Sequence, residues 1–203
     1  MKTKIINYLD ELIPNPTCEL NYSKDYELLI AVMLSAQTTD KRVNLVTEKL
    51  FKKYNSLNSL SKADLNDIID IIKSIGTFNK KAKNILLIAN KLLPYGKVIN
   101  DRIFLESLSG VGRKTTNVVL SILFNEQCIA VDTHVTRVAC RLGLTKKNDS
   151  VLEIEKKLTK YFASENLSRI HHQLVLFGRY YCKAQKPKCE VCKLKDICNL
   201  IKF

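Results

Sequence analysis

The chain contains the stretch Leu108-Ser109-Gly110-Val111-Gly112-Arg113-Lys114-Thr115-Thr116-Asn117. It places two glycines one residue apart between two apolar segments. Apolar residues at 103–108 and 118–124 predict a helix on each side, with a tight hairpin between them. Gly110 and Gly112 can adopt positive φ and let another backbone approach closely. The N–H groups of the turn and of the second helix's first turn then point outward, where they suit a phosphate.

Lys114 lies in the first turn of the second predicted helix. A lysine there opposes the helix dipole, which already places positive charge at the N-terminus. The same field favours the neutral amine, the form that acts as a nucleophile. A solvated surface lysine is the ordinary alternative in so basic a chain. Lys114 departs from it through its neighbours, the hairpin before it and the carboxylate of Asp132 after it.

Asp132 stands in the segment Ala130-Val131-Asp132-Thr133-His134, at the predicted start of a later helix. Spacing alone favours an N-cap aspartate, and a cap also holds its carboxylate rigidly. A carboxylate and an amine that face one cleft suit chemistry at a sugar C1′ atom. The carboxylate stabilises oxocarbenium charge or activates the nucleophile, while the amine attacks and forms a Schiff base. We therefore predict Lys114 and Asp132 as catalytic residues. For His134, a DNA contact and a packing role are equally open.

The C-terminal segment contains the second strong signal, four cysteines spaced Cys182-x6-Cys189-x2-Cys192-x5-Cys198. In a reducing compartment such a group predicts metal ligands and not disulfides. Thiolates at this spacing suit tetrahedral zinc or an iron–sulfur cluster, and the spacing leaves both open. Lys186 and Lys188 lie between the first two cysteines, so a pinned loop would present cations to a phosphate backbone. A solvated charge run is the alternative.

The composition favours a nucleic-acid partner. The chain has 203 residues and a formal net charge of +13, with 46% hydrophobic and 26% charged residues. This balance is typical of a globular protein with a polyanionic partner, nucleic acid first and an anionic membrane second. The N-terminal residues lack the apolar segment of a signal peptide, and the longest apolar run, 28–34, is too short to span a bilayer. We therefore expect an intracellular protein with reduced cysteines.

Helical periodicity recurs along the chain, and no stretch alternates as a strand does. The pattern predicts an all-α protein. The helices are expected at 3–13, 24–37 with Ser23 as its N-cap, 40–51, from a Ser61–Asp64 capping box to Gly76, at 79–94, then on both sides of the hairpin, and at 133–142, 151–162 and 167–181.

Several of these segments together resemble the endonuclease III family of helix-hairpin-helix DNA glycosylases. The resemblance rests first on the Gly110–Thr115 hairpin, on Val131-Asp132-Thr133-His134 and on the four-cysteine ending. It extends to the stretch from Leu29 to Asp40, to Ile75-Gly76 with Asn79-Lys80-Lys81-Ala82, and to His171-His172 through Gly178-Arg179-Tyr180. Nearly the whole chain is covered, in the family's order.

The resemblance implies a bifunctional DNA glycosylase and AP lyase that removes oxidised pyrimidines in base excision repair. Lys114 would attack C1′ of the damaged nucleotide, Asp132 would assist, and β-elimination would cut the strand 3′ to the abasic site. The damaged nucleotide would be flipped out, and Gln37 would enter the gap. Four cysteines would hold a [4Fe–4S] cluster: Cys182, Cys189, Cys192 and Cys198. The expected DNA contacts are Gln37, Gly110, Val111, Gly112, Arg113, Thr115, His134, Lys186 and Lys188.

The implied fold has two helical lobes with DNA in the cleft between them. Residues 18–127 would form a helical barrel domain that contains the helix-hairpin-helix at about 101–124. Residues 1–17 and 128–203 would form the second lobe, with the cluster loop at 182–198. The expected partner is double-stranded DNA with damaged pyrimidines or abasic sites, bound by a monomer in the cytoplasm.

One position departs from the family pattern, and two alternative functions stay open. Thr77 stands where a larger apolar residue commonly wedges into the base stack, and threonine is a poor wedge. One alternative is a superfamily member with another lesion specificity. The other is a non-catalytic basic DNA-binding module, which accounts for the charge, the glycines and the cysteines but not for Lys114 with Asp132. A zinc enzyme does not fit, because four thiolates close the site, whereas catalytic zinc keeps one position open.

Overall fold

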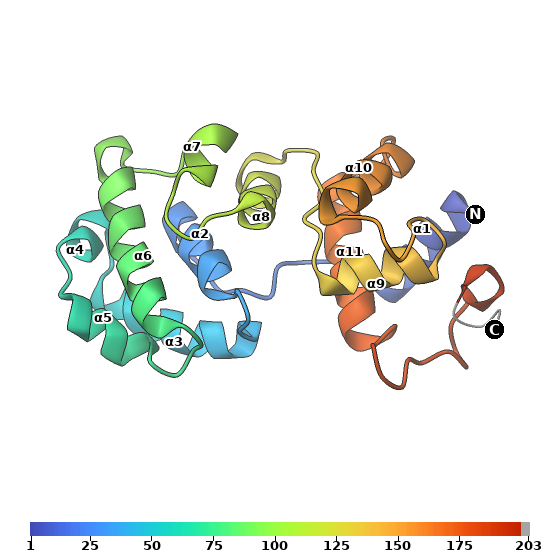
Figure 1. Ribbon diagram of the computed structural model, residues 1–203, viewed down its shortest axis with the longest axis horizontal. Coiled ribbons are helices and arrows are strands. Elements are labelled where there is room, and N and C mark those ends of the chain that lie inside the picture. The colour runs from blue at the N-terminus through green and yellow to red at the C-terminus, as the bar shows by residue number, and fades with distance from the viewer. Residues whose placement is uncertain (200–203) are drawn as a thin grey trace. The chain divides into compact units, whose positions relative to one another are not determined.

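The computed structural model describes residues 1–199, and within them the chain is helical and contains no strand, as predicted. Its internal contacts divide it into two compact units (Figure 1). Unit 1 combines residues 1–17 with 125–199, and unit 2 contains residues 18–124. The domain boundaries expected from the sequence, 18–127 for the barrel domain and 1–17 with 128–203 for the second lobe, stay predictions. None of the described helices is long and apolar enough to cross a membrane.

Unit 2 is built around one buried helix. Its elements are α2 (Asp25–Leu34), α3 (Asp40–Lys53), α4 (Leu57–Ser61), α5 (Leu65–Ile72), α6 (Phe78–Leu92), the 3-10 turn η1 (Leu93–Tyr95), α7 (Arg102–Glu106) and α8 (Arg113–Phe124). Every side chain of α2 from Tyr26 to Leu34 is buried, and α2 packs against α3, α6 and α8. A helix that is apolar on all sides needs such enclosure, so α2 is the core of this unit.

Three helix boundaries in unit 2 differ from the prediction. The N-cap of α2 is Lys24 and not Ser23, because the Glu27 side chain accepts hydrogen bonds from the Ser23 and Lys24 backbone N–H groups. The same helix ends at Leu34 and not at residue 37. The predicted Ser61–Asp64 capping box is also wrong. Asp64 alone caps α5, and the preceding residues form a separate short helix, α4, that the periodicity did not show.

Unit 1 packs four helices around a common core. Its elements are α1 (Lys2–Leu12), α9 (Thr133–Arg141), α10 (Val151–Tyr161), α11 (Leu167–Tyr180) and the 3-10 turn η2 (Lys195–Ile197). The last long helix, α11, packs against both α9 and α1. The approach to α9 is close at Gly178, where an added Cβ would lie 2.8 Å from the Cβ of His134. The core contains Ile5, Leu9, Val135, Ile154, Leu158, Phe162 and Leu174.

Candidate functional site

The predicted hairpin is present between α7 and α8. The Val111 N–H donates to the Leu108 carbonyl at 3.1 Å and closes the turn. Leu108 and Val111 are both 4% exposed, so these two side chains fix the turn to the unit. Gly110 has φ +77°, the left-handed region that glycine favours. Gly112 does not adopt positive φ, so only one of the two glycines is needed for the turn itself.

The residues that follow the turn form the start of α8, which faces solvent. The Gly112 carbonyl accepts from the Thr116 N–H at 2.9 Å and is therefore the first acceptor of the helix. Arg113 and Lys114 are exposed, and Thr115 is half-buried. The first N–H groups of any helix have no intrahelical acceptor. The start of α8 therefore combines outward N–H groups with the amine of Lys114, as the sequence predicts.

Asp132 is the N-cap of α9 in unit 1. Its Oδ1 atom accepts a hydrogen bond from the Val135 N–H at 2.8 Å. The side chain is half-buried. The predicted cap is therefore confirmed, and it restricts the carboxylate to one orientation.

His134 follows on the same helix and is fixed by Arg137. The Arg137 Nη2 atom lies 3.1 Å from His134 Nδ1, and the same nitrogen donates to the Gly178 carbonyl at 2.8 Å. A guanidinium has donors only, so Nδ1 is the acceptor and the ring hydrogen lies on Nε2. His134 thus has one remaining ring donor, Nε2–H, of a kind that suits a phosphate oxygen. Sequence reasoning missed Arg137, whose only signal is its place one turn after His134.

Gln37 lies in the turn between α2 and α3, with an exposed side chain and φ 56°. Thr77, at the N-terminus of α6, has φ 55° and is exposed as well. Positive φ is uncommon for any non-glycine residue and is strained for a β-branched one. Two of the positions that the sequence relates to the base stack therefore have unusual backbones.

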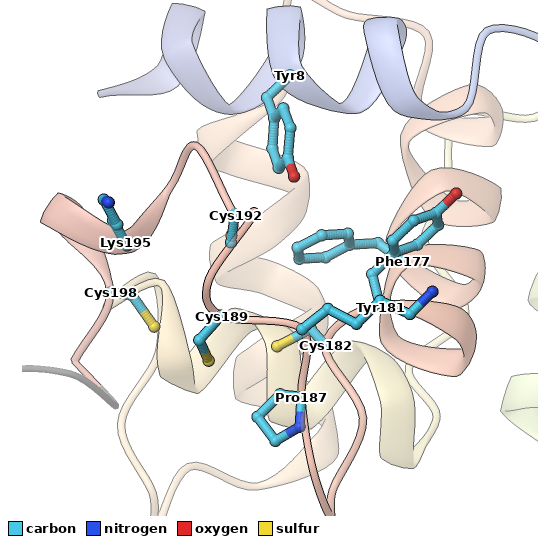
Figure 2. A pocket seen from close by; sticks show the side chains of 10 residues that line it. Tyr8, Phe177, Tyr181, Cys182, Pro187, Cys189, Cys192, Lys195 and Cys198 are labelled. Carbon is cyan, nitrogen blue, oxygen red and sulfur yellow. The ribbon is translucent and has the colours of Figure 1, made fainter.

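The four C-terminal cysteines line one pocket of unit 1 (Figure 2). Cys182 follows α11, Cys189 and Cys192 lie in the loop, and Cys198 directly follows η2 and is 8% exposed. Aromatic rings lie beside the thiols. Tyr8 comes from α1 and lies edge-on to Phe177, with ring centroids 6.1 Å apart.

Two arginines of α9 hold the start of this loop. Arg141 Nη1 donates to the Lys183 carbonyl at 2.7 Å and to the Cys182 Sγ atom at 3.3 Å. Arg137 Nε donates to the Cys182 carbonyl at 3.1 Å. Two lysines of the same loop have other surroundings. Lys186 is exposed, with φ 48°, and the Lys188 ammonium lies 4.8 Å above the centre of the Tyr181 ring.

The donor set fits an iron–sulfur cluster better than a single zinc ion. Zinc would need its sulfur ligands about 2.3 Å from one point. Four thiols that surround a common space leave room for a group of several atoms. Burial, followed by the neighbouring thiols, raises the pKa of Cys189, so its thiolate needs a nearby positive charge.

Comparison with known proteins places this geometry in a family. Residues 30–164 match the HhH-GPD superfamily of base excision DNA repair proteins, and residues 182–198 match the iron–sulfur binding domain of endonuclease III. Endonuclease III of Bacillus subtilis (strain 168) is 46% identical over 196 residues, which cover 96% of this chain and 90% of that protein. Endonuclease III of Escherichia coli (strain K12) is 44% identical over 200 residues, covering 98% and 94%.

Solved structures agree with this placement. A trapped endonuclease III–DNA covalent intermediate has a TM-score of 0.92 at 46% identity, covering 100% of this chain and 97% of that chain. A thermostable thymine-DNA glycosylase, 22% identical with a TM-score of 0.84, shares the fold. The predicted [4Fe–4S] cofactor is confirmed by the match of the cysteine segment. The chain therefore belongs to the endonuclease III family of base excision DNA repair proteins, and its activity is that of a DNA N-glycosylase and AP lyase.

Proposed function

We propose that the chain removes oxidised pyrimidines from double-stranded DNA, with Lys114 as the nucleophile and Asp132 as its carboxylate partner. The observation that carries this proposal is the exposed amine of Lys114 in the first turn of α8, directly after the hairpin. Unit 2 supplies the amine and unit 1 supplies the carboxylate. One chain therefore contains both groups, which supports a monomer as the active form.

The reaction needs a neutral amine at C1′ of the damaged nucleotide. Lys114 donates its electron pair to C1′, and the bond to the base breaks, so that the base leaves with the electron pair of the broken C1′–N bond and takes up a proton. The amine nitrogen then loses one proton and forms a double bond to C1′ as the protonated Schiff base, while the sugar ring oxygen leaves C1′ with the electron pair of the C1′–O bond and takes up a proton to become a hydroxyl. Removal of a proton from C2′ expels the 3′ phosphate and cuts the strand.

Asp132 acts beside the amine through its charge and its fixed position. A carboxylate stabilises the positive charge that develops on the sugar as the base leaves. It also accepts the proton that the Lys114 ammonium must lose before the neutral amine attacks. Because the N-cap hydrogen bond to Val135 already orders the side chain, little conformational entropy is lost when the substrate binds.

The other proposed DNA contacts bind either the phosphate backbone or the base stack. The hairpin residues Gly110, Val111 and Gly112, with Arg113 and Thr115, bind phosphate through backbone N–H groups and the arginine charge. His134 donates from Nε2, and Lys186 and Lys188 add cations from the cysteine loop. Gln37 enters the space that the flipped nucleotide leaves.

Cys182, Cys189, Cys192 and Cys198 are the proposed cluster ligands. When bound, the cluster supplies four metal–sulfur bonds that fix the loop. This chain's own residues then determine what the loop presents, because Arg141 and Arg137 hold its carbonyls on α9. We place the activity in the cytoplasm, on chromosomal DNA, where thiolate ligands stay reduced.

Borohydride trapping tests the nucleophile. Borohydride reduces a Schiff base to a stable bond, so the protein should form a covalent band with a duplex that carries one oxidised pyrimidine and none with the undamaged duplex. Lys114→Ala should lower trapping and strand cleavage at least about a thousandfold, the order of loss on removing a covalent nucleophile. DNA affinity should stay largely intact. Lys62→Ala, at another exposed lysine of unit 2, is the matched control.

Peptide mapping of the trapped adduct decides the residue. An adduct on Lys114 supports the proposal, whereas an adduct elsewhere, or undiminished cleavage by Lys114→Ala, rejects it. A duplex with a plain abasic site separates lesion choice from chemistry. Trapping on that duplex without trapping on the oxidised pyrimidine would keep the amine chemistry and reject the proposed lesion.

A further inference from the structure

Lys81 is a buried lysine of unit 2 that the proposed reaction does not use. It lies on α6 and is 5% exposed. Its ammonium donates to three neutral oxygens: the Leu34 carbonyl at 2.8 Å, the Ala36 carbonyl at 2.7 Å and the Thr38 hydroxyl at 3.2 Å. Burial lowers the pKa of this side chain. A buried ammonium loses its hydration, so it needs these oxygens as hydrogen-bond acceptors.

The three oxygens belong to the end of α2 and the turn that follows it. The last carbonyls of a helix have no intrahelical donor, and they carry the negative end of the helix dipole. The Lys81 ammonium satisfies both needs at once. It also brackets Gln37, because its contacts lie on the residues immediately before and after that position.

The backbone of Lys81 makes a second connection. Its N–H donates to the Thr77 carbonyl at 3.1 Å, at the first turn of α6. Lys81 therefore contacts the turn of Gln37 through its side chain and the Thr77 position through its main chain. Both of those positions have positive φ. Such strained residues persist only where the surroundings fix them, and they gather at functional sites.

The same helix also meets the hairpin. Asn84, one turn after Lys81, is 9% exposed, and an added Cβ on Gly110 would lie 2.3 Å from its Nδ2 atom. The helix α6 therefore contacts the turn of Gln37 through Lys81 and the hairpin through Asn84. We propose that Lys81 is a positioning residue for base excision, which holds the 35–38 turn so that Gln37 enters the duplex at a fixed place relative to the hairpin. This inference rests on the proposed role of Gln37.

The test compares duplex excision with chemistry that needs no gap filling. Lys81→Met keeps the length and apolar stem of the side chain and removes its charge. Single-turnover excision from a duplex with one oxidised pyrimidine should slow about tenfold to a hundredfold, the order that misplacement of a catalytic element costs. Borohydride trapping on a single-stranded abasic oligonucleotide should keep its wild-type rate, because there is no opposite strand for Gln37 to enter. Lys83→Met, exposed and about 200° away around α6, removes the same charge and should change neither rate.

A double-mutant cycle shows whether Lys81 acts through Gln37. If it does, Gln37→Ala should add little to the loss already caused by Lys81→Met, whereas independent effects multiply. A 2-aminopurine base opposite the lesion reports the insertion directly. Its fluorescence should rise on binding of the wild type and much less with Lys81→Met. Thr38→Val, which removes only the weakest of the three acceptors, should slow duplex excision about threefold and supports the inference even if Lys81→Met folds poorly.

Four results would overturn the inference. The first is an equal loss of duplex excision and single-strand trapping by a folded Lys81→Met, which indicates a general structural role. The second is a pair of effects that multiply in the cycle, together with an unchanged rate for Thr38→Val. The third is a wild type that traps on neither substrate, which rejects the proposed function and this inference with it. An active wild type with an unaffected Lys81→Met rejects only the inference.

Discussion

The hairpin of unit 2 and the cysteine loop of unit 1 (residues 182–198) both present functional groups, but they are held in different ways. The hairpin is fixed by its own backbone hydrogen bond and by the buried side chains of Leu108 and Val111. The cysteine loop has one short 3-10 turn, and many of its residues are exposed. It is held by the Arg137 and Arg141 guanidinium groups and by ion pairs with Lys4 and Glu11 of α1.

This difference predicts where each region is vulnerable. A hairpin with buried apolar contacts forms together with its unit, because hydrophobic burial stabilises both at once. A loop with few buried apolar side chains has little to offset the conformational entropy lost on ordering. Cluster binding is therefore expected to supply the free energy that orders the loop. We therefore expect changes in the hairpin to act on folding and DNA contact, and changes in the loop to act through the cofactor.

The largest effect is expected from loss of a cluster ligand. Cys189→Ala should remove the visible absorption of the purified protein and destabilise unit 1 by about 4 kcal/mol or more, the contribution of a ligand present at a thousand times its dissociation constant. Hydrogen exchange should rise in the cysteine loop and stay unchanged in α6. Cys140→Ala, on α9 and outside the thiol pocket, is the control and should keep the absorption. Retained absorption in Cys189→Ala would remove this cysteine from the ligand set.

The two hairpin glycines should separate folding from binding. Gly110→Ala should lower the free energy of unfolding by about 2 kcal/mol or more, because it adds a left-handed backbone cost to a clash with Asn84. An added Cβ at Gly112 meets nothing within 4 Å. Gly112→Ala should therefore cost at most about 1 kcal/mol, the difference between Gly and Ala at a helix N-cap. It should nevertheless weaken DNA binding, because the methyl group would stand where we propose that the backbone approaches phosphate. Urea unfolding and a titration with labelled duplex measure the two quantities, and equal stability losses would contradict the contrast.

The smallest effect is a difference in acid sensitivity between the units. The chain has three histidines, His134, His171 and His172, and all belong to unit 1. Burial lowers the pKa of His172 below its usual 6.5. As the pH falls through about 6.5, the unfolded chain binds a proton that the folded chain refuses, so stability is lost until the pH reaches the lowered folded pKa. The hydrogen-exchange protection factors of α11, corrected for the intrinsic pH dependence of amide exchange, should therefore fall between pH 7 and 5, while those of α6 do not. His172→Gln should reduce this dependence, and an unchanged slope would reject His172 as its source.

The sequence predicts most of the candidate site because its signals are local. The glycine spacing predicts the turn, and the position of Asp132 before an apolar helical pattern predicts its cap, which the structure confirms. The cysteine spacing predicts a metal site, and the family resemblance implies a [4Fe–4S] cluster, which the match of residues 182–198 to an iron–sulfur binding domain confirms. The roles of Lys114 and Gln37 stay predictions, which the trapping and fluorescence experiments test.

Helix boundaries were less predictable than helices. The all-α class follows from a periodicity that each segment shows by itself. The periodicity does not predict the end of α2 at Leu34, because residues that favour a helix continue to Gln37. The helix stops there because the Lys81 ammonium takes the terminal carbonyls and the next turn adopts positive φ. The short helix α4 and the N-cap Asp64 depend on local polar contacts. Several neighbouring polar residues could have formed the same caps, so the sequence alone does not select between them.

The sequence by itself determined the class of fold, the hairpin, the N-cap aspartate and the four cysteines, because each depends on residues within a few positions of one another. Only the tertiary structure decided which side chains hold these parts in place. Lys81 binds a carbonyl 47 residues before it in the chain, and Arg141 binds one 42 residues after it. The physical reason is that a buried ammonium or a guanidinium pairs with whichever carbonyl the packing of helices brings within reach, and no local pattern of residues encodes that carbonyl.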